Sequence, residues 1–256
     1  MIIGVIIMAS YKRENDYIRL LSERDHTVQE LAAKLFISEP TVRRDIIDLK
    51  EKDLLICKRG LVTLKTNSPD KRIPRFIRDL EHNEEKKEIA IKAASLIKDG
   101  DILFLDQSST SLYLANEIAN RRGLTVITNN TEIMICLANS KLKVISCGGY
   151  LSTDNRNCLI GDDARQTFEN FYADIAFFST KSISTDGIIS DCSREEVAIR
   201  NTMLKQASKK VFLCDSTKFN TLSPCRQCTL EDVDCFISEG NASEQFASLC
   251  KDTIFM

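Results

Sequence analysis

Residues 37–46 read Ile-Ser-Glu-Pro-Thr-Val-Arg-Arg-Asp-Ile, and they decide the fold of the first part of the chain. Ser38 is a suitable N-cap, because its hydroxyl can accept a hydrogen bond from the first helical turn. Val42, Ile46 and Leu49 follow at the spacing of one buried helical face. The stretch therefore predicts a helix that begins after Ser38 and packs one side against a core.

The sequence before this helix predicts a second helix. Thr27 and Glu30 form a capping box, in which each side chain satisfies a backbone N–H of the other residue. The helix is expected over residues 28–35, after a loop at residues 25–26 and an earlier helix over about residues 12–23. Two helices joined by a short turn predict a helix-turn-helix, whose second helix enters the major groove of DNA.

Residues 54–64 resemble two short strands around a basic tip, which is the pattern of a wing. Hydroxyl and basic side chains in this part of the chain are of the types that contact phosphates and guanine edges. The candidate DNA-binding residues are Ser38, Thr41, Arg43, Arg44, Lys58 and Arg59. One alternative is another trihelical bundle with a solvated charged face. A second is a scaffold or partner-binding protein whose helix-turn-helix has lost its DNA role.

The composition is that of an ordinary globular protein. The 256 residues are 43% hydrophobic and 28% charged, which excludes collagen-like, disordered and disulfide-scaffold classes. The formal net charge is −2, so the chain as a whole has no basic footprint for nucleic acid. Residues 11–66 carry a net charge of +2 and the remainder −4. Any nucleic-acid binding is therefore expected to be local to the first part.

The early apolar run at residues 1–9 is far shorter than the roughly 20 residues that span a bilayer. We expect no membrane segment and a cytoplasmic location, with either Met1 or Met8 as the natural start. The ten cysteines are expected to be reduced and mostly buried. Cys225, Cys228 and Cys235 raise a zinc hypothesis, but a tetrahedral site needs four ligands and both histidines are distant in sequence. No metal and no cofactor is therefore assigned.

The second part of the chain alternates helical and apolar strand-like segments, which predicts an α/β fold with a mainly parallel sheet. A linker is expected over residues 67–85, followed by a helix over residues 85–98. Small polar residues follow the predicted strands, at the positions where open α/β sheets bind ligands. Residues 108–110 begin a predicted helix. Hydroxyl and N–H groups at a helix start can bind an anion, but hydroxyls there are also ordinary N-caps. Residues 239–256 are expected to form a closing helix and a short tail.

Residues 12–64 resemble the DNA-binding domain of the DeoR family of bacterial transcriptional regulators. The family's run Val-Ser-x-x-Thr-Ile-Arg-Arg-Asp-Leu corresponds to residues 37–46, with changes only at aliphatic positions. At the wing, the family's His-Gly-Gly is replaced by Arg59-Gly60-Leu61. The second half, about residues 86–237, resembles the family's sensor domain, a fold shared with pentose-phosphate isomerases.

The matching sensor elements include Asp106-x-x-Ser109-Thr110, Thr128-Asn129, Gly148-Gly149 and Asp215-x-x-Lys218-Phe219, with Ser108 where the family has glycine. The resemblance implies that Ser109 and Thr110 hold a phosphate, that Asp106 and Asn129 bind sugar hydroxyls, and that Lys218 adds positive charge. The full set of candidate effector-binding residues is Asp106, Ser108, Ser109, Thr110, Thr128, Asn129, Gly148, Gly149, Lys181, Asp191, Glu195 and Lys218.

We therefore expect a winged helix-turn-helix domain over residues 8–66, a linker over residues 67–85 and a larger α/β effector-sensing domain over residues 86–256. The expected function is that of a repressor of a sugar-catabolism operon, with double-stranded operator DNA and a phosphorylated sugar as partners. A homodimer or homotetramer is expected, because helix-turn-helix proteins read paired half-sites. The enzyme alternative is a sugar-phosphate isomerase, with carboxylates at 106, 191 and 195 near Lys218.

Overall fold

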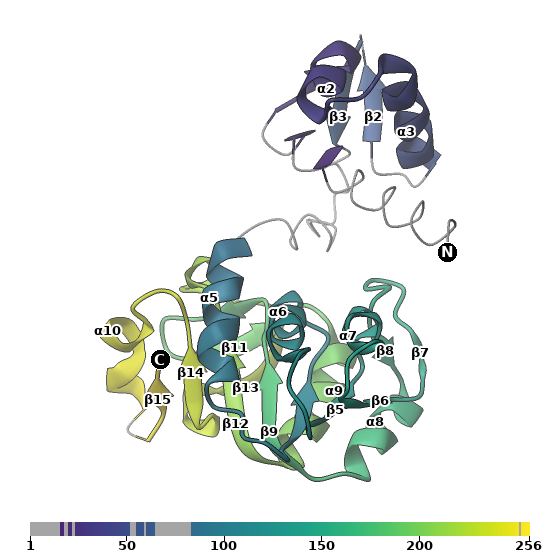
Figure 1. Ribbon diagram of the computed structural model, residues 1–256. Coiled ribbons are helices and arrows are strands. Elements are labelled where there is room, and N and C mark those ends of the chain that lie inside the picture. The colour runs from purple at the N-terminus through teal and green to yellow at the C-terminus, as the bar shows by residue number, and fades with distance from the viewer. Residues whose placement is uncertain are drawn as a thin grey trace. The chain divides into compact units, whose positions relative to one another are not determined.

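The computed structural model describes residues 16–17, 20–21, 24–51, 55–58, 60–64, 83–250 and 252–256. The chain divides into two compact units, Met1–Glu81 and His82–Met256, and each is described by itself (Figure 1). The possible starts at Met1 and Met8, Arg59 of the wing and nearly all of the expected linker lie outside the described residues.

The first unit contains the predicted helix-turn-helix and wing. Its elements are β1 (His26–Thr27), α2 (Val28–Leu35), α3 (Glu39–Glu51), β2 (Leu55–Lys58) and β3 (Leu61–Leu64). The helix predicted over residues 28–35 is confirmed, as are the helix after Ser38 and the two strands of the wing. The four described residues of the expected first helix, 16, 17, 20 and 21, are helical.

Local hydrogen bonds and one small core explain these elements. In the capping box, the Thr27 hydroxyl accepts from the Glu30 N–H at 3.2 Å, and the Glu30 carboxylate accepts from the Thr27 N–H at 2.8 Å. The predicted stripe of α3 is buried against residues from α2 and the wing. The core residues are Tyr17, Leu20, Leu21, Leu31, Val42, Ile46, Leu49, Leu55 and Val62.

The expectation of a loop at residues 25–26 is wrong at its second residue. His26 and Thr27 form strand β1, which pairs antiparallel with β3 so that His26 lies opposite Val62. The His26 side chain is fully buried. A two-residue strand has no periodicity of its own, and its partner is more than thirty positions away in sequence, so local pattern could not reveal it.

The second unit is an α/β domain around a parallel sheet of seven strands, in the order β15-β14-β12-β9-β4-β5-β6. The predicted parallel sheet is therefore confirmed. The strands are β4 (Ile102–Leu105), β5 (Thr125–Thr128), β6 (Lys143–Ser146), β9 (Ala173–Phe178), β12 (Ala207–Leu213), β14 (Cys235–Ile237) and β15 (Ile254–Phe255). The helices are α5 (Asn83–Ala94), α6 (Ser109–Ile118), α7 (Thr131–Leu137), α8 (Asp162–Glu169), α9 (Arg194–Lys205) and α10 (Ala242–Phe246).

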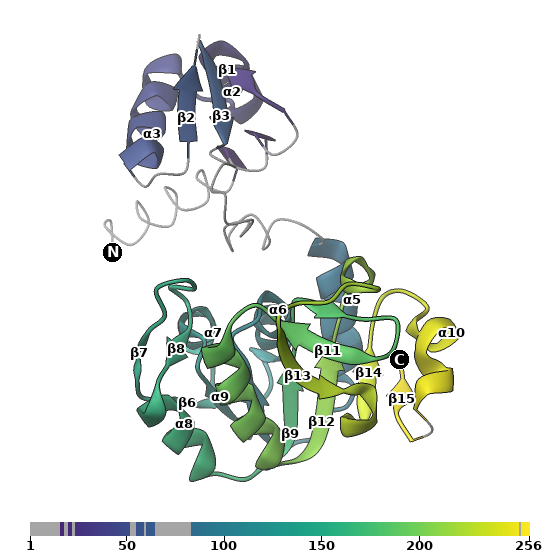
Figure 2. The same cartoon turned by 180° about the vertical axis from the view of Figure 1, so that it is seen from behind.

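Both faces of the sheet are covered, so its strands are apolar on both sides. Successive side chains of a strand point to opposite faces. Helices α5, α6 and α7 cover one face of the sheet (Figure 1). Leu103 and Leu105 of β4 pack on that face. Phe104 packs on the opposite face with Phe168 of α8 and Met203 of α9 (Figure 2). The domain therefore has two cores separated by one sheet.

Smaller strands sit beside this sheet. A second sheet has the order β10-β11-β13, formed by β10 (Ser182–Ile183), β11 (Ile188–Asp191) and β13 (Cys225–Thr229). A hairpin pairs β7 (Tyr150–Leu151) with β8 (Leu159–Ile160). The expected closing helix is short, and the expected tail is instead the edge strand β15, which pairs parallel with β14.

The turn between α2 and α3 contains a strained residue. Phe36 is the C-cap of α2 and adopts a left-handed conformation with φ of 56°, although its side chain is 94% exposed. A residue with a Cβ pays a conformational penalty there that glycine does not. Because the exposed ring contributes little packing, the fold carries this strain without compensation from burial.

We predict that Phe36→Gly raises the free energy of unfolding of the N-terminal unit by about 1 kcal/mol. Phe36→Ala is the matched control, since it removes the same exposed ring but keeps the Cβ that causes the strain. Scanning calorimetry of the full chain compares the three proteins. A glycine variant that melts no higher than the alanine variant would contradict this account of the turn.

Candidate functional site

The opening turn of α3 presents the candidate DNA-binding residues on its exposed side. The Ser38 hydroxyl lies 2.9 Å from the Thr41 hydroxyl and 3.4 Å from the Thr41 N–H, so both side chains take part in the cap of α3. Arg43 and Arg44 are exposed, and the Arg43 guanidinium is 3.4 Å from the Glu39 carboxylate. Ion pairs between such exposed groups are weak, so Arg43 can exchange Glu39 for a DNA phosphate at small cost.

The wing adds further basic character near its tip. Lys58 is exposed at the end of β2, and Gly60, with φ of 81°, makes the turn to β3. Arg59, the other candidate at the tip, lies outside the described residues. The cap of α3 and the end of β2 thus provide hydroxyls and cations, which are the groups that contact a phosphate backbone.

In the α/β domain, the strands of the main sheet run parallel, so their carboxyl ends meet at one edge. Residues 106–110 follow β4, residues 129–130 follow β5, residues 147–149 follow β6, residues 179–181 follow β9 and residues 214–218 follow β12. The strand order places β9 and β4 at the centre. The sheet thus brings most of the predicted effector-binding residues to one edge, and Asp191 and α9 reach it from the neighbouring layer.

The Asp106 carboxylate organises the loop that opens α6. It is fully buried and accepts hydrogen bonds from the Ser108 N–H at 3.1 Å, the Ser108 hydroxyl at 2.5 Å and the Ser111 hydroxyl at 2.7 Å. Its other oxygen accepts from the Ser179 N–H at 3.1 Å. Ser108 is the N-cap of α6 with φ of −72°, so serine occupies the family's glycine position in an ordinary extended conformation.

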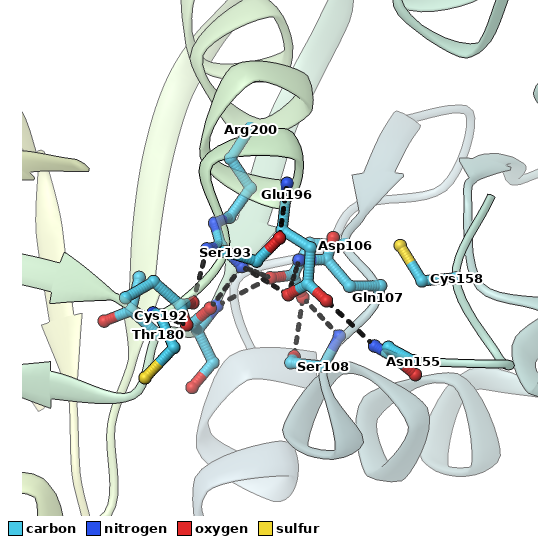
Figure 3. A network of polar contacts seen from close by, with 12 residues as sticks. Asp106, Gln107, Ser108, Asn155, Cys158, Thr180, Cys192, Ser193, Glu196 and Arg200 are labelled. Atoms are coloured by element: carbon cyan, nitrogen blue, oxygen red, sulfur yellow. Dashed lines mark hydrogen bonds and ion pairs between the residues drawn. The ribbon is translucent and has the colours of Figure 1, made fainter. Parts of the chain in front are cut away.

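A completely buried arginine, Arg200 of α9, lies next to Asp106 of this loop (Figure 3). Its guanidinium pairs with Asp191, with Asp106 at 3.5 Å and with Glu196 at 3.9 Å. Burial alone would lower the pKa of the guanidinium, but the three carboxylates outweigh burial and raise that pKa above its ordinary value. Arg200 therefore remains charged and holds Asp106 in place.

Arg200 also connects the edge of the main sheet to the second sheet. Its Nη1 donates to the Ser179 carbonyl at 3.2 Å, and its Nε donates to Gln227 Oε1 at 2.9 Å. Removing one member of such a buried group leaves an uncompensated charge, which lowers the free energy of unfolding by roughly 3–5 kcal/mol. The positions of the Ser108 loop and of the end of β9 thus depend on one cation.

Two buried polar atoms at this edge have no hydrogen-bond partner among the described residues. They are Oγ1 of Thr110, in the first turn of α6, and Oδ1 of Asn129, directly after β5. An unsatisfied buried polar atom costs roughly 1–3 kcal/mol, so such atoms are rare in folded proteins. Together with the positive end of the α6 dipole, they indicate a place where a polar, anionic ligand completes the hydrogen bonding.

The residues that follow β5 and β6 shape the same edge. Thr128 is buried, and its hydroxyl accepts from the Asn130 N–H at 3.0 Å. Gly148 and Gly149 are exposed. A Cβ at Gly149 would lie 2.2 Å from the Ile160 carbonyl oxygen, and its φ is 97°, so only glycine fits there.

The predicted lysine of the site lies after β12. The Lys218 Nζ is 3.0 Å from both the Asp215 carboxylate and the Ser179 hydroxyl. Burial would raise the pKa of Asp215, but Lys218 and a hydrogen bond from Thr217 lower it to about 2. Lys181, after β9, is exposed. The Lys218 ammonium is therefore a cation at the carboxyl edge that contacts Asp215 and Ser179.

One predicted carboxylate, Glu195, lies outside this group of contacts, and its neighbour Glu196 belongs to it. Glu195 is exposed and makes no hydrogen bond or ion pair with the described residues, whereas Glu196 contacts Gln107, Asn155 and Arg200. Asp191, also predicted, pairs with Arg200. Sequence reasoning overlooked Gln107, Asn155, Ser179, Glu196 and Arg200. One signal was available, because Arg200 lies on the same helical stripe as Val197 and Leu204 and is therefore an arginine at an apolar position.

The zinc hypothesis has no support in the described part of the chain. No group of three or more His, Cys, Asp or Glu side chains there is arranged to hold a metal ion. Cys225 and Cys228 lie on β13, whereas Cys235 is buried on β14 in the other sheet. Burial raises the pKa of the Cys228 thiol to about 12. Among the described helices, none is long and apolar enough to cross a membrane.

Comparisons with known proteins agree with these two units. Residues 13–67 match the family described as the DeoR-like helix-turn-helix domain, and residues 81–240 match the DeoR C terminal sensor domain. The HTH-type transcriptional regulator GolR of Listeria innocua is 34% identical over 245 residues, with 93% of each chain covered. The glycerol-3-phosphate regulon repressor of Escherichia coli is 25% identical, with 89% of this chain and 90% of the relative covered.

Among solved structures, the chain is similar to ribose 5-phosphate isomerase A from Methanocaldococcus jannaschii, with a TM-score of 0.42 and 17% identity over 54% of this chain and 55% of that one. A winged helix-turn-helix combined with an α/β sensor defines the class of two-domain transcriptional regulators. Within this class, the chain belongs to the DeoR family.

Proposed function

We propose that this DeoR-family regulator represses a sugar-catabolism operon and that a phosphorylated sugar, bound at the carboxyl edge of the main sheet, controls its affinity for the operator. The observation that carries the proposal is a pair of buried atoms, Thr110 Oγ1 and Asn129 Oδ1, that have no hydrogen-bond partner in the described part of the chain and lie beside the start of α6. A helix N-terminus attracts a phosphate, and hydroxyls of a sugar supply the missing donors. The name of one relative, the glycerol-3-phosphate regulon repressor, points to the same class of ligand.

The remaining elements of the proposal follow from this arrangement. The DNA-contacting residues are Ser38, Thr41, Arg43, Arg44, Lys58 and Arg59, in a domain over residues 8–66 that a linker over residues 67–85 joins to a sensor over residues 86–256. The chain acts in the cytoplasm, as a homodimer or homotetramer that reads paired half-sites. Effector and DNA favour different arrangements of the protein, so each weakens the binding of the other by the same factor.

We propose a regulatory rather than a catalytic role for the sensor. An isomerase needs a carboxylate that can take a proton from the substrate. Asp106, Asp191 and Glu196 are instead paired with Arg200, and Asp106 already accepts hydrogen bonds from three residues. These carboxylates therefore serve as structural acceptors, which leaves the sheet edge able to bind a sugar phosphate without converting it.

Binding of the full-length protein to a duplex carrying its own upstream region tests the proposal. We expect specific binding that one member of a panel of sugar phosphates weakens by roughly tenfold or more, which corresponds to about 1.4 kcal/mol of coupling. Fluorescence anisotropy at a stated salt concentration measures it. Absence of any sequence preference would contradict the regulator, and sustained conversion of a sugar phosphate would show an enzyme.

The double variant Arg43→Ala, Arg44→Ala tests the recognition helix. Both side chains are exposed, so the fold should remain intact while DNA affinity falls and its dependence on salt becomes shallower. Titrations between about 50 and 200 mM salt give that slope. Lys141→Ala, Lys143→Ala removes the same charge from exposed positions of the sensor and serves as the control. Equal affinity of the two double variants would place the DNA interface elsewhere.

The Thr110→Val variant tests the effector site. Valine keeps the shape of threonine but removes a buried hydroxyl that has no partner among the residues the structure describes, so the free energy of unfolding should rise by roughly 1 kcal/mol. Affinity for the sugar phosphate should fall by roughly tenfold, because the lost hydroxyl contacts an ionised ligand. Calorimetry measures both. Thr202→Val, which removes a hydroxyl bonded to the Ala198 carbonyl, is the control for stability. Unchanged affinity for the effector would remove Thr110 from the site.

A further inference from the structure

The outward side of α3 carries an aliphatic side chain that does not belong to the core. Ile46 packs in the buried stripe of the helix, together with Val42 and Leu49. Each residue turns an α-helix by about 100°, so Ile47 faces away from that stripe, and its side chain is 57% exposed. Single exposed aliphatic residues are ordinary on protein surfaces. The position of Ile47 on the helix is therefore more informative than its exposure alone.

Ile47 lies on the same side of α3 as the two candidate arginines. It follows Arg44 by three residues and Arg43 by four, and side chains at these spacings are neighbours on a helix. Both arginines are exposed, as is Pro40, seven residues before Ile47. Positions i, i+3, i+4 and i+7 are also those from which the recognition helix of a homeodomain reads bases. Ile47 thus extends the proposed DNA-facing side of α3 by one turn.

Contacts on the other side of α3 keep Ile47 at the surface. The buried stripe packs against α2 and the wing. In addition, the Tyr17 hydroxyl donates to Asp45 Oδ2 of α3 at 3.2 Å, and the Tyr17 side chain is fully buried. A rotation that buried Ile47 would break both sets of contacts. The fold therefore holds this side chain in place before any partner binds, which lowers the entropy cost of binding.

The chemistry of Ile47 differs from that of its two neighbours. Arg43 and Arg44 present hydrogen-bond donors and positive charge, which suit phosphates and guanine edges. An isoleucine side chain offers neither a donor nor an acceptor. In the major groove, the 5-methyl group of thymine is the apolar group that side chains contact to read a base. DNA is thus a partner that matches both the charged part and the apolar part of this helix face.

We propose that Ile47 packs against a thymine methyl group of the operator and thereby selects an A·T base pair at that position. The inference rests on the regulatory function proposed above and deepens it by assigning one base contact. Phosphate contacts position a protein on DNA without reading its sequence, whereas this contact distinguishes thymine from the other bases. It involves no charge and releases no counterions, so it adds specificity without adding salt dependence.

Replacing thymine by uracil in the DNA tests the contact, because uracil differs from thymine only by lacking the methyl group. Two duplexes carry the protein's own upstream region, one with thymine and one with uracil. Fluorescence anisotropy at a stated salt concentration gives the affinity of the full chain for each. We expect the wild type to bind the uracil duplex more weakly by roughly fourfold for each methyl group contacted, which is the scale for burying one such group.

The Ile47→Ala variant should lose this discrimination. It should bind the thymine duplex more weakly than the wild type does, and it should bind both duplexes with equal affinity, because the partner of the methyl group is gone. Alanine favours a helix more than isoleucine does and position 47 is exposed, so the fold should remain intact, which circular dichroism checks. The dependence of affinity on salt should equal that of the wild type, since both arginines remain.

Ile135→Ala is the matched control. It removes an isoleucine side chain that is 74% exposed, on α7 of the sensor domain. This variant should keep the wild-type affinity for both duplexes. An equal change in the two variants would come from the loss of exposed apolar surface in general, and it would overturn the assignment of Ile47 to a base.

The outcomes separate this inference from the function on which it rests. A wild-type protein without any sequence preference would contradict both. Specific binding by the wild type with equal affinity for the thymine and uracil duplexes would overturn only the role of Ile47. An Ile47→Ala variant that binds more weakly but keeps the wild-type preference for thymine would also overturn it, because Ile47 would then act in the fold or in a contact between copies of the chain.

Discussion

The ion pairs of one buried arginine govern the carboxyl edge of the sensor domain. Arg200 is taken entirely out of water, a transfer that is costly for a charge unless partners compensate it. Its partners are Asp106 in the loop after β4, Asp191 on β11 and Glu196 on its own helix. Because each partner belongs to a different element, satisfying the one cation fixes the relative positions of all of them.

These contacts fix the geometry of the proposed effector site before a ligand binds. Asp106 holds Ser108 and Ser111 so that α6 begins in a fixed orientation, and Ser179 is held from both sides by Asp106 and Arg200. A site whose first contacts are supported in this way loses little freedom when a ligand arrives. The same edge thus combines groups with several hydrogen bonds and two buried atoms, Thr110 Oγ1 and Asn129 Oδ1, that have no partner among the described residues.

The parts of the fold that sequence could predict are those determined by near neighbours. The capping box at Thr27 and Glu30 and the apolar stripe of α3 act within one or two helical turns, so both were visible in the chain. β1 was not, because it exists only through pairing with β3. The tail that forms β15 escaped prediction for the same reason.

The candidate site shows the same division. The small polar residues after the strands were found because the carboxyl edge of a parallel sheet gathers them wherever the strands come in sequence. The choice between Glu195 and Glu196 could not be made, since it depends on how α9 is rotated against the sheet. Gln107 and Asn155 carry no motif at all, and their meaning arises only from the shared contact with Glu196.

The proposed regulation requires that ligand binding at this edge affects the part of the sensor nearest in sequence to the DNA-binding domain. Helix α5 opens the described part of the sensor, and it is tied to the edge at two points. Asn83 Oδ1 accepts from the hydroxyl of Tyr113, on the helix that the Ser108 loop begins, at 2.7 Å. Lys92 Nζ donates to the Ser238 carbonyl, after β14, at 2.8 Å. Coupling needs a two-state element that both ligands bias. Within the proposed function, α5 is a candidate for that element, because it contacts both α6 and the residue that follows β14.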